Sequence, residues 1–239
     1  GVIWAFIQPV ITVLLYWFVF EFGLHQKVND LRTGIEVPFV LWLMGGLVPW
    51  FYFQEALNGG TGVLDEYSYL VKKVVFQIDA LPVVKLISAL FTHAFFVIFM
   101  LVVFVVMGFY PDLYVLQVVY YSFCMVMFTA GLIYATSAVT VFFRHMKEVV
   151  AILLQIGMWV TPIMWNFESM QGIPKWAVVL LKLNPMYYIV SGYRDALINK
   201  TAFWEHPGLT LWFWGITLFT LWAGTTVFKR LRVHFADVL

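Results

Sequence analysis

Charge is scarce in this sequence, and cysteine is almost missing. Asp, Glu, Lys and Arg make up 11% of the 239 residues, against roughly 25% in soluble domains. Hydrophobic residues make up 63%, against roughly 45–50% in soluble domains, and a soluble fold of this length could not bury the surplus. Cys124 is the only cysteine, which excludes an intrachain disulfide framework and a cysteine-based metal site.

Motifs for nucleotide binding, metal binding and catalysis are missing as well. Gly59, Gly60 and Gly62 form a cluster that lacks the Gly-Lys-Ser/Thr of a phosphate-binding loop. The five histidines stand singly, so we expect no metal site. No nucleophile elbow or other catalytic set is present. We therefore expect neither an enzyme acting alone nor a nucleic-acid partner.

Long apolar stretches are what the chain has in abundance. A helix of about 20 residues crosses a hydrocarbon core of roughly 30 Å. We take the first stretch as a true span, because it contains Trp4, Trp17 and Glu21 and lacks the basic start of a signal peptide. The pattern predicts an all-α polytopic membrane protein with one transmembrane domain, residues 1–239. The six predicted spans are residues 2–23, 37–57, 83–109, 115–143, 149–166 and 209–228.

Basic residues favour one set of connections between these spans. The 142–148 connection has Arg144 and Lys147, and a Lys-Arg-Leu-Arg tail follows the last span at 229–232. The 110–114 connection has Asp112 and no basic residue. Because basic residues concentrate on the cytoplasmic side of membranes, we expect both termini in the cytoplasm.

Residues 58–82 form a long connection on the same predicted side. Asp65 and Glu66 suit a helix N-terminus. The pattern predicts an amphipathic helix over residues 65–76 that lies on the membrane surface or docks on a partner, and the alternative is a solvated linker. The apolar face of this helix would be formed by Leu70, Val71, Val74 and Val75.

Prolines interrupt the apolar segment 149–200. Thr161-Pro162 ends the fifth span, and Pro174 opens a short helix over 175–183. Asn184 would end that helix in a left-handed conformation, and Pro185 would open the next over 186–199. We expect a re-entrant helical hairpin between the last two spans, because irregular backbone at membrane depth persists only beside protein or water. An external cap without a transport role is the alternative.

Polar and aromatic side chains in this region are candidates for an outer gate. Arg194 could attract phosphate groups of a cargo, or pair with Asp195 or Glu168. The candidate gate residues are Pro162, Trp165, Pro174, Asn184, Pro185 and Arg194.

Aromatic residues make up 20% of the chain, more than two interfacial belts require. Their rings could offer contact area to a sliding polymer, although any one of them could simply face lipid. Glu21 and Glu55 lie near the ends of apolar spans, where an ionisable group is a functional candidate. A gating or phosphate-repelling role and a snorkelling position both remain open for them. The aromatic candidates for a translocation path are Trp17, Trp42, Trp50, Tyr52 and Trp159.

Several stretches, in order, resemble the membrane-spanning subunits of ABC-type polysaccharide exporters. The resemblance covers essentially the whole chain, and the ending FADVL at 235–239 is typical of the permeases of wall teichoic acid exporters. The stretches are GVIWAFIQPVITVLLYWFVFEFG at 1–23, VPFVLWLMGGLVPWFYF at 37–53, SYLVKKVVF at 68–76, WVTPIMW at 159–165 and LNPMYYIVSGYRDAL at 183–197.

The resemblance implies a permease that works as a homodimer with two copies of a cytoplasmic ABC ATPase in the bacterial cytoplasmic membrane. ATP and Mg would be bound by the ATPase, and no cofactor by this chain. The implied cargo is wall teichoic acid linked to a polyprenyl diphosphate lipid, taken up from among the membrane lipids. The alternatives are an O-antigen or capsular polysaccharide exporter subunit, a secondary transporter and an intramembrane lipid-modifying enzyme. The implied ATPase-coupling residues are Asp65, Glu66, Tyr69, Leu70, Lys72, Lys73, Phe76 and Arg144.

Overall fold

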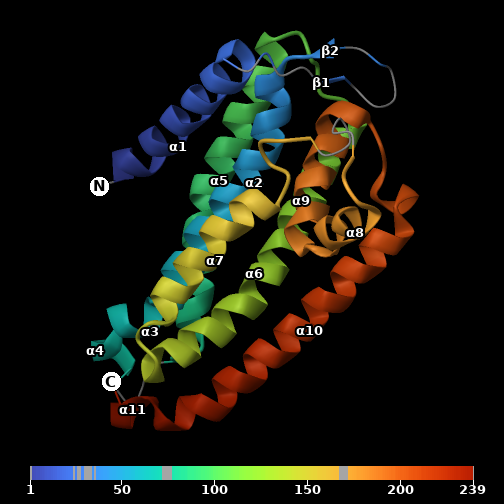
Figure 1. Cartoon of the computed structure of the whole chain (residues 1–239). Helices are drawn as coiled ribbons and strands as arrows, with labels where there is room; N and C mark the ends of the chain where they lie inside the picture. The colour runs from blue at the N-terminus through green and yellow to red at the C-terminus, as the bar shows by residue number, and fades with distance from the viewer. Residues whose placement is uncertain are drawn as a thin grey trace.

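Helices make up nearly all of the computed structural model (Figure 1). The structure describes residues 2–23, 25, 28–29, 34, 36–71, 77–166 and 172–238. Its long helices are α1 (Val2–Trp17), α2 (Phe39–Thr61), α5 (Ala80–Val106), α6 (Gln117–Phe142), α7 (Met146–Val160) and α10 (Pro207–Leu231). A π-helix, η1 (Phe18–Gly23), extends α1, and the strands β1 (Val28–Asn29) and β2 (Glu36–Val37) pair antiparallel before α2.

Short helices connect the long ones. Two of them, α3 (Val63–Glu66) and α4 (Ser68–Val71), follow α2, and α8 (Lys175–Leu183) and α9 (Pro185–Arg194) follow the break after α7. The predicted bounds of the first helix after that break, 175–183, are confirmed. The remaining short elements are η2 (Leu113–Leu116), η4 (Asp195–Asn199), η5 (Phe203–Glu205), η6 (Arg232–His234) and α11 (Phe235–Val238).

Within the described residues, four helical segments are long and apolar enough to cross a membrane: Phe6–Gly23, Ala80–Val106, Leu113–Phe142 and Pro207–His234. They coincide with four of the predicted spans. The two others, α2 and α7, do not meet the same standard, and α7 has only 15 residues. It ends at Val160, not at 166, because Pro162 disfavours helical backbone at Thr161, which is extended. The count of six spans stays a prediction.

Helix α2 lies at the centre of the molecule. It contacts α1, α5, α6, α7 and α9, and most of its side chains are buried, including Leu41, Leu43 and Leu47 at 0% exposure. A helix that is apolar all round is expected to be enclosed by other elements. Every element that surrounds α2 is therefore positioned with respect to it.

Small residues allow α6 and α10 to pack closely. A methyl group at Gly224 would overlap the carbonyl oxygen of Gly131, and one at Gly131 would lie 2.7 Å from the backbone nitrogen of Leu221. Contacts between small residues let helix backbones approach each other inside membranes. The two glycines thus fix where these two long helices cross.

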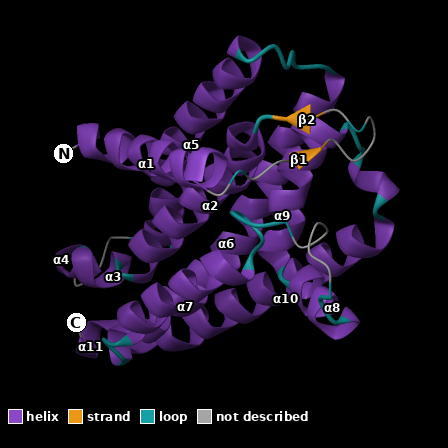
Figure 2. Cartoon of the chain, turned by 45° about the horizontal axis from the view of Figure 1, so that its top comes forward, coloured by secondary structure: helices purple, strands orange, loops and turns teal. Residues whose placement is uncertain are grey.

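The connections gather at two opposite ends of the bundle (Figure 1). One end holds α3, α4, the turn between α6 and α7, and α11. The other end holds the β1–β2 hairpin and the connection between α5 and α6. Figure 2 shows the same separation from a second direction. The connections at 142–148 and 110–114 lie at opposite ends, as predicted, while the side of the membrane that each end faces stays a prediction.

Candidate functional site

A groove of about 470 Å³ lies between α1, α2 and α5, with Met158 of α7 at its margin. Its lining combines aromatic rings with uncharged polar groups and one carboxylate. Pro9, Val48 and the buried ring of His93 also contribute to the wall. The aromatic lining residues are Trp4, Tyr16, Phe51, Tyr52 and Phe96, and the polar ones are Gln8, Thr12, Gln54, Glu55, Asn58 and Thr92.

One face of α2 supplies the centre of this groove. Phe51, Gln54, Glu55 and Asn58 follow the spacing of a single helical face, and the last three side chains are exposed although most of α2 is buried. The hydroxyl of Thr92 on α5 donates to Oε1 of Glu55 over 3.4 Å, a long hydrogen bond. Polar side chains on otherwise apolar spans mark pathways for polar cargo by default.

A buried polar cluster supports the groove from behind. His93 Nε2 lies 2.9 Å from the hydroxyl of Tyr193 on α9, which in turn lies 2.6 Å from Oγ of Ser122 on α6. The His93 ring also packs beside the ring of Tyr52, with 5.2 Å between centroids. The cluster links the groove wall on α2 and α5 to α9. A shift of α9 would therefore move the side chains of His93 and Tyr52 in that wall.

Arg194, at the end of α9, is 7% exposed and bonds to backbone carbonyls of two other segments. Its Nε donates to the carbonyl of Trp42 over 3.2 Å. Its two terminal nitrogens donate to the carbonyls of Pro162 and Ile163, each over 2.7 Å. These carbonyls belong to the break after α7, where the helix no longer uses them. Arg194 thereby fastens the end of α7 to α2 and α9.

Glycines on α2 make room for this arginine. A methyl group at Gly46 would lie 2.8 Å from Nη2 of Arg194, and one at Gly45 would lie 3.2 Å from its Cγ. The guanidinium carbon lies 3.3 Å from the centre of the Trp42 ring, which is within cation–π range. Arg194 therefore acts as a structural anchor in this conformation, and an attraction for cargo phosphates stays a prediction.

Asn184 makes a second link across the same break. Its Oδ1 accepts from the backbone nitrogen of Met186 over 3.0 Å and so caps α9. Its Nδ2 donates to Oγ1 of Thr161 over 2.8 Å. The predicted left-handed conformation at Asn184 is wrong: the residue is extended, as a helix N-cap requires.

The predicted outer-gate residues occupy the junctions of this broken segment. Pro162, Trp165 and Arg194 line a smaller cavity of about 180 Å³, while Pro174 and Pro185 stand at the starts of α8 and α9. The helical segment predicted over 186–199 does extend to Asn199, and it changes from the α-helix α9 to the π-helix η4 at Asp195. Glu168 lies outside the described residues. The gate role and the re-entrant hairpin stay predictions.

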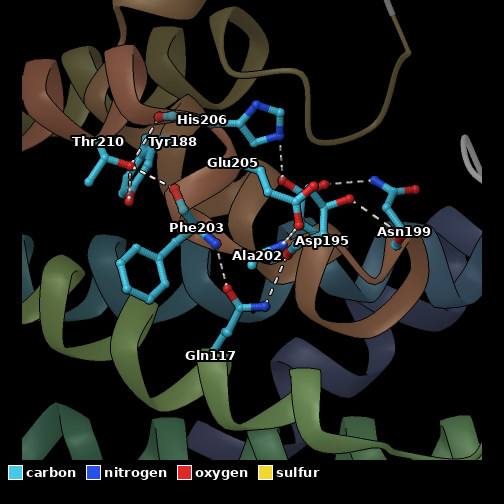
Figure 3. A network of polar contacts seen from close by, with 10 residues as sticks. Gln117, Tyr188, Asp195, Asn199, Ala202, Phe203, Glu205, His206 and Thr210 are labelled. Atoms are coloured by element: carbon cyan, nitrogen blue, oxygen red, sulfur yellow. Dashed lines mark hydrogen bonds and ion pairs between the residues drawn. The ribbon is translucent and has the colours of Figure 1, made fainter.

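Side chains from α6, α9 and η4 fix the connection between η4 and α10 (Figure 3). The amide of Gln117 donates to the carbonyl of Thr201 over 3.0 Å and accepts from the backbone nitrogen of Phe203 over 2.8 Å. Asp195 accepts from Asn199 over 2.8 Å. The hydroxyls of Tyr188 and Thr210 lie 3.0 Å apart and join α9 to α10. These contacts hold the connection between η4 and α10 against α6, and the start of α10 against α9.

The predicted aromatic path residues are not brought together. Tyr52 lines the groove, whereas Trp42 lies under Arg194 at the smaller cavity. Trp50 is 1% exposed and packs over Gly157 of α7, and Trp159 is 60% exposed outside the groove. Trp17 donates to Glu21 within the α1–η1 segment. Sequence reasoning identified Glu55 as a candidate but missed the uncharged polar groove residues, for which the signal was the i, i+4 pair Gln54 and Asn58 inside an apolar run.

Of the predicted ATPase-coupling residues, Asp65 and Glu66 belong to α3 and Tyr69 to α4, at one end of the bundle (Figure 1). Arg144 lies in the turn between α6 and α7 at the same end. Asp65 pairs with Lys147 and Glu66 with Lys85, each over 2.7 Å. The single amphipathic helix predicted over 65–76 is wrong where it is described, because Tyr67 forms a turn between α3 and α4. Tyr69 and Arg144 are exposed. Lys72, Lys73 and Phe76 lie outside the described residues, as does the side chain of Leu70.

A bundle of apolar helices with a polar groove along one of them is typical of a membrane-spanning transport protein. The chain belongs to the ABC-2 type transporter family, whose model matches residues 1–198. Permeases of this family are membrane subunits that work with a cytoplasmic ABC ATPase, and they are not enzymes alone.

Curated relatives match over nearly the whole chain. The O-antigen export system permease protein RfbA of Myxococcus xanthus is 26% identical over 99% of this chain and 87% of its own length. A protein of the same name from Klebsiella pneumoniae is 24% identical over 100% of this chain and 87% of its own length. The polysialic acid transport protein KpsM of Escherichia coli is 25% identical over 96% of this chain and 85% of its own length.

Proposed function

We propose that this chain is the permease subunit of an ABC exporter that moves a polysaccharide across the bacterial cytoplasmic membrane. The groove between α1, α2 and α5 supports the proposal most directly, because it offers aromatic and hydrogen-bonding side chains to a hydroxyl-rich polymer. The names of the relatives support an O-antigen or capsular polysaccharide as the cargo. They give no support to wall teichoic acid. We therefore propose an O-antigen or capsular polysaccharide in its place.

Two copies of the chain would form the path. Among the described residues, α1 and α5 flank the exposed polar face of α2, with Met158 of α7 also in the groove lining, so a second copy could complete the enclosure. The lipid-linked end of the polymer would stay in the membrane while its sugar units pass through. Two ATPase subunits would bind ATP and Mg and dock near α3 and α4. Both termini would then lie in the cytoplasm.

Movement of the broken segment would open the path at the opposite end. Closure of the ATPases would displace α3, which is tied to α5 and α7 through Lys85 and Lys147. Helix α7 would carry this motion to Thr161, and from there the Asn184 and Arg194 contacts would pass it to α9. The transition would be a small rigid-body shift of packed helices.

Reconstitution tests the proposal. The chain and its ATPase would be purified together, placed in proteoliposomes and supplied with a lipid-linked glycan. We expect glycan to reach the far side only with ATP, and we expect vanadate to stop it. Transport by the chain without an ATPase, driven by an ion gradient, would show a secondary transporter and overturn the proposal.

A further inference from the structure

The charged side chains that line the groove are of one sign, negative. Glu55 is the only acidic residue in its lining, and no Lys or Arg among the described residues lines it. The basic groups described at the adjoining end of α2 are used in ion pairs: Lys85, whose side chain passes beside Gly59, pairs with Glu66, and Lys147 pairs with Asp65. The His93 ring is 4% exposed and bonded within the buried cluster. The groove lining that the structure describes thus places no cation beside the Glu55 carboxylate.

A negative charge in such a groove distinguishes between cargo types. Two like charges repel more strongly where protein and lipid lower the effective dielectric below that of water. An uncharged sugar unit escapes this repulsion and can donate hydroxyl hydrogens to the carboxylate. The amides of Gln8, Gln54 and Asn58 add donors and acceptors, and the rings of Trp4 and Phe51 add flat apolar contact area.

We propose that this groove binds a run of uncharged sugar units, and that Glu55 is a specificity-determining residue that disfavours polymers with phosphate or carboxylate groups. The inference rests on the proposed function and narrows its cargo. Family membership does not decide the matter, because one of the relatives is named for an acidic polymer. The preference for uncharged sugars is inferred from the residues that line the groove of this chain.

Binding of matched probes tests the inference on the complete complex of permease and ATPase in lipid nanodiscs. The probes are maltoheptaose, which is uncharged, and a sialic acid heptamer, which carries a carboxylate on each unit. We expect the wild-type complex to bind maltoheptaose at least about tenfold more tightly than the acidic probe. A glycerol phosphate oligomer of similar length should bind as weakly as the sialic acid heptamer.

Substitutions at Glu55 assign the discrimination to this residue. Glu55→Gln keeps the size and the hydrogen bonding of the side chain, so binding of maltoheptaose should change little while the tenfold preference falls toward one. Glu55→Lys should favour the acidic probe. Glu205→Gln is the matched control, because Glu205 accepts from the backbone nitrogen of Ala202 and does not line the groove; its preference should equal that of the wild type.

The outcomes separate this inference from the proposed function. Equal binding of both probes by the wild type, or an unchanged preference in Glu55→Gln, would overturn the inference. Binding of neither probe by a complex that still exports its own glycan would also overturn it. A complex that exports no glycan under ATP would instead contradict the proposed function.

Discussion

The guanidinium of Arg194 is stacked on the indole ring of Trp42, with 3.3 Å between Cζ and the ring centre. Arg194 lies on α9 and Trp42 on α2, and the two residues are 152 positions apart in the chain. A charge so deeply buried is tolerated only when its donors are used. Here the donors of Arg194 bond to three backbone carbonyls. Two of these carbonyls, of Pro162 and Ile163, belong to the break after α7 and are not used by a helix.

Replacing Arg194 by lysine should weaken this junction. An ammonium group cannot reach carbonyls in three directions, nor does it stack as a planar guanidinium does. We expect Arg194→Lys to lower the free energy of unfolding by about 2–4 kcal/mol, since hydrogen bonds to a buried charge are lost. The measurement is denaturation in mixed detergent micelles. Arg230→Lys, at an exposed position of α10, is the control; equal stability of both variants would contradict the role of Arg194 as an anchor.

A methyl group at the crossing of α6 and α10 should separate these helices. Gly224→Ala would overlap the carbonyl of Gly131, whereas nothing lies within 4 Å of the position that a methyl group would take at Gly215 on the same helix. We expect Gly224→Ala to cost about 1–3 kcal/mol through overpacking. Gly215→Ala should be neutral or stabilising by about 0.5–1 kcal/mol, because alanine favours a helix more than glycine does. Melting temperatures of the two purified variants test this, and identical values would exclude a close crossing.

Removing the contact between Thr161 and Asn184 should loosen the break after α7. Thr161→Val removes one partner and Asn184→Ala the other, and the alanine also removes the cap of α9. A double-mutant cycle should give a coupling of about 0.5–1.5 kcal/mol, the range of one hydrogen bond. The cap is lost in both the Asn184 single variant and the double variant, so its contribution cancels in the cycle. A coupling near zero would mean that this bond does not hold the segment.

The sequence predicted the elements of this fold better than it predicted their contacts. Long apolar runs mark α5, α6 and α10 through their hydropathy, and prolines mark the end of α7 and the start of α8 through lost backbone donors. Arg194 was identified, but its partners are backbone carbonyls, which no side-chain pattern reveals. The connection after α2 was predicted as one helix because a periodic pattern does not show the turn at Tyr67.

The groove could not be predicted from the aromatic residues alone. Trp50 and Tyr52 stand two positions apart on α2, yet the first packs over Gly157 and the second lines the groove. Which face of α2 stays uncovered depends on where α1, α5 and α7 pack. The polar residues on that face were the better signal, because a buried position would leave them without hydrogen bonds.

Helix α4 presents Tyr69 at the end of the bundle where the ATPase is proposed to dock. Tyr69 is 60% exposed, and exposed aromatic residues commonly anchor protein interfaces. We expect Tyr69→Glu to reduce the amount of ATPase that purifies with the permease by about fivefold or more, equivalent to a loss of about 1 kcal/mol. The matched control is Tyr110→Glu, since Tyr110 is 73% exposed in the connection between α5 and α6 at the opposite end. Because each substitution adds the same charge at an exposed tyrosine, only proximity to the ATPase should separate them. Equal recovery of the ATPase from both variants would place the docking surface elsewhere.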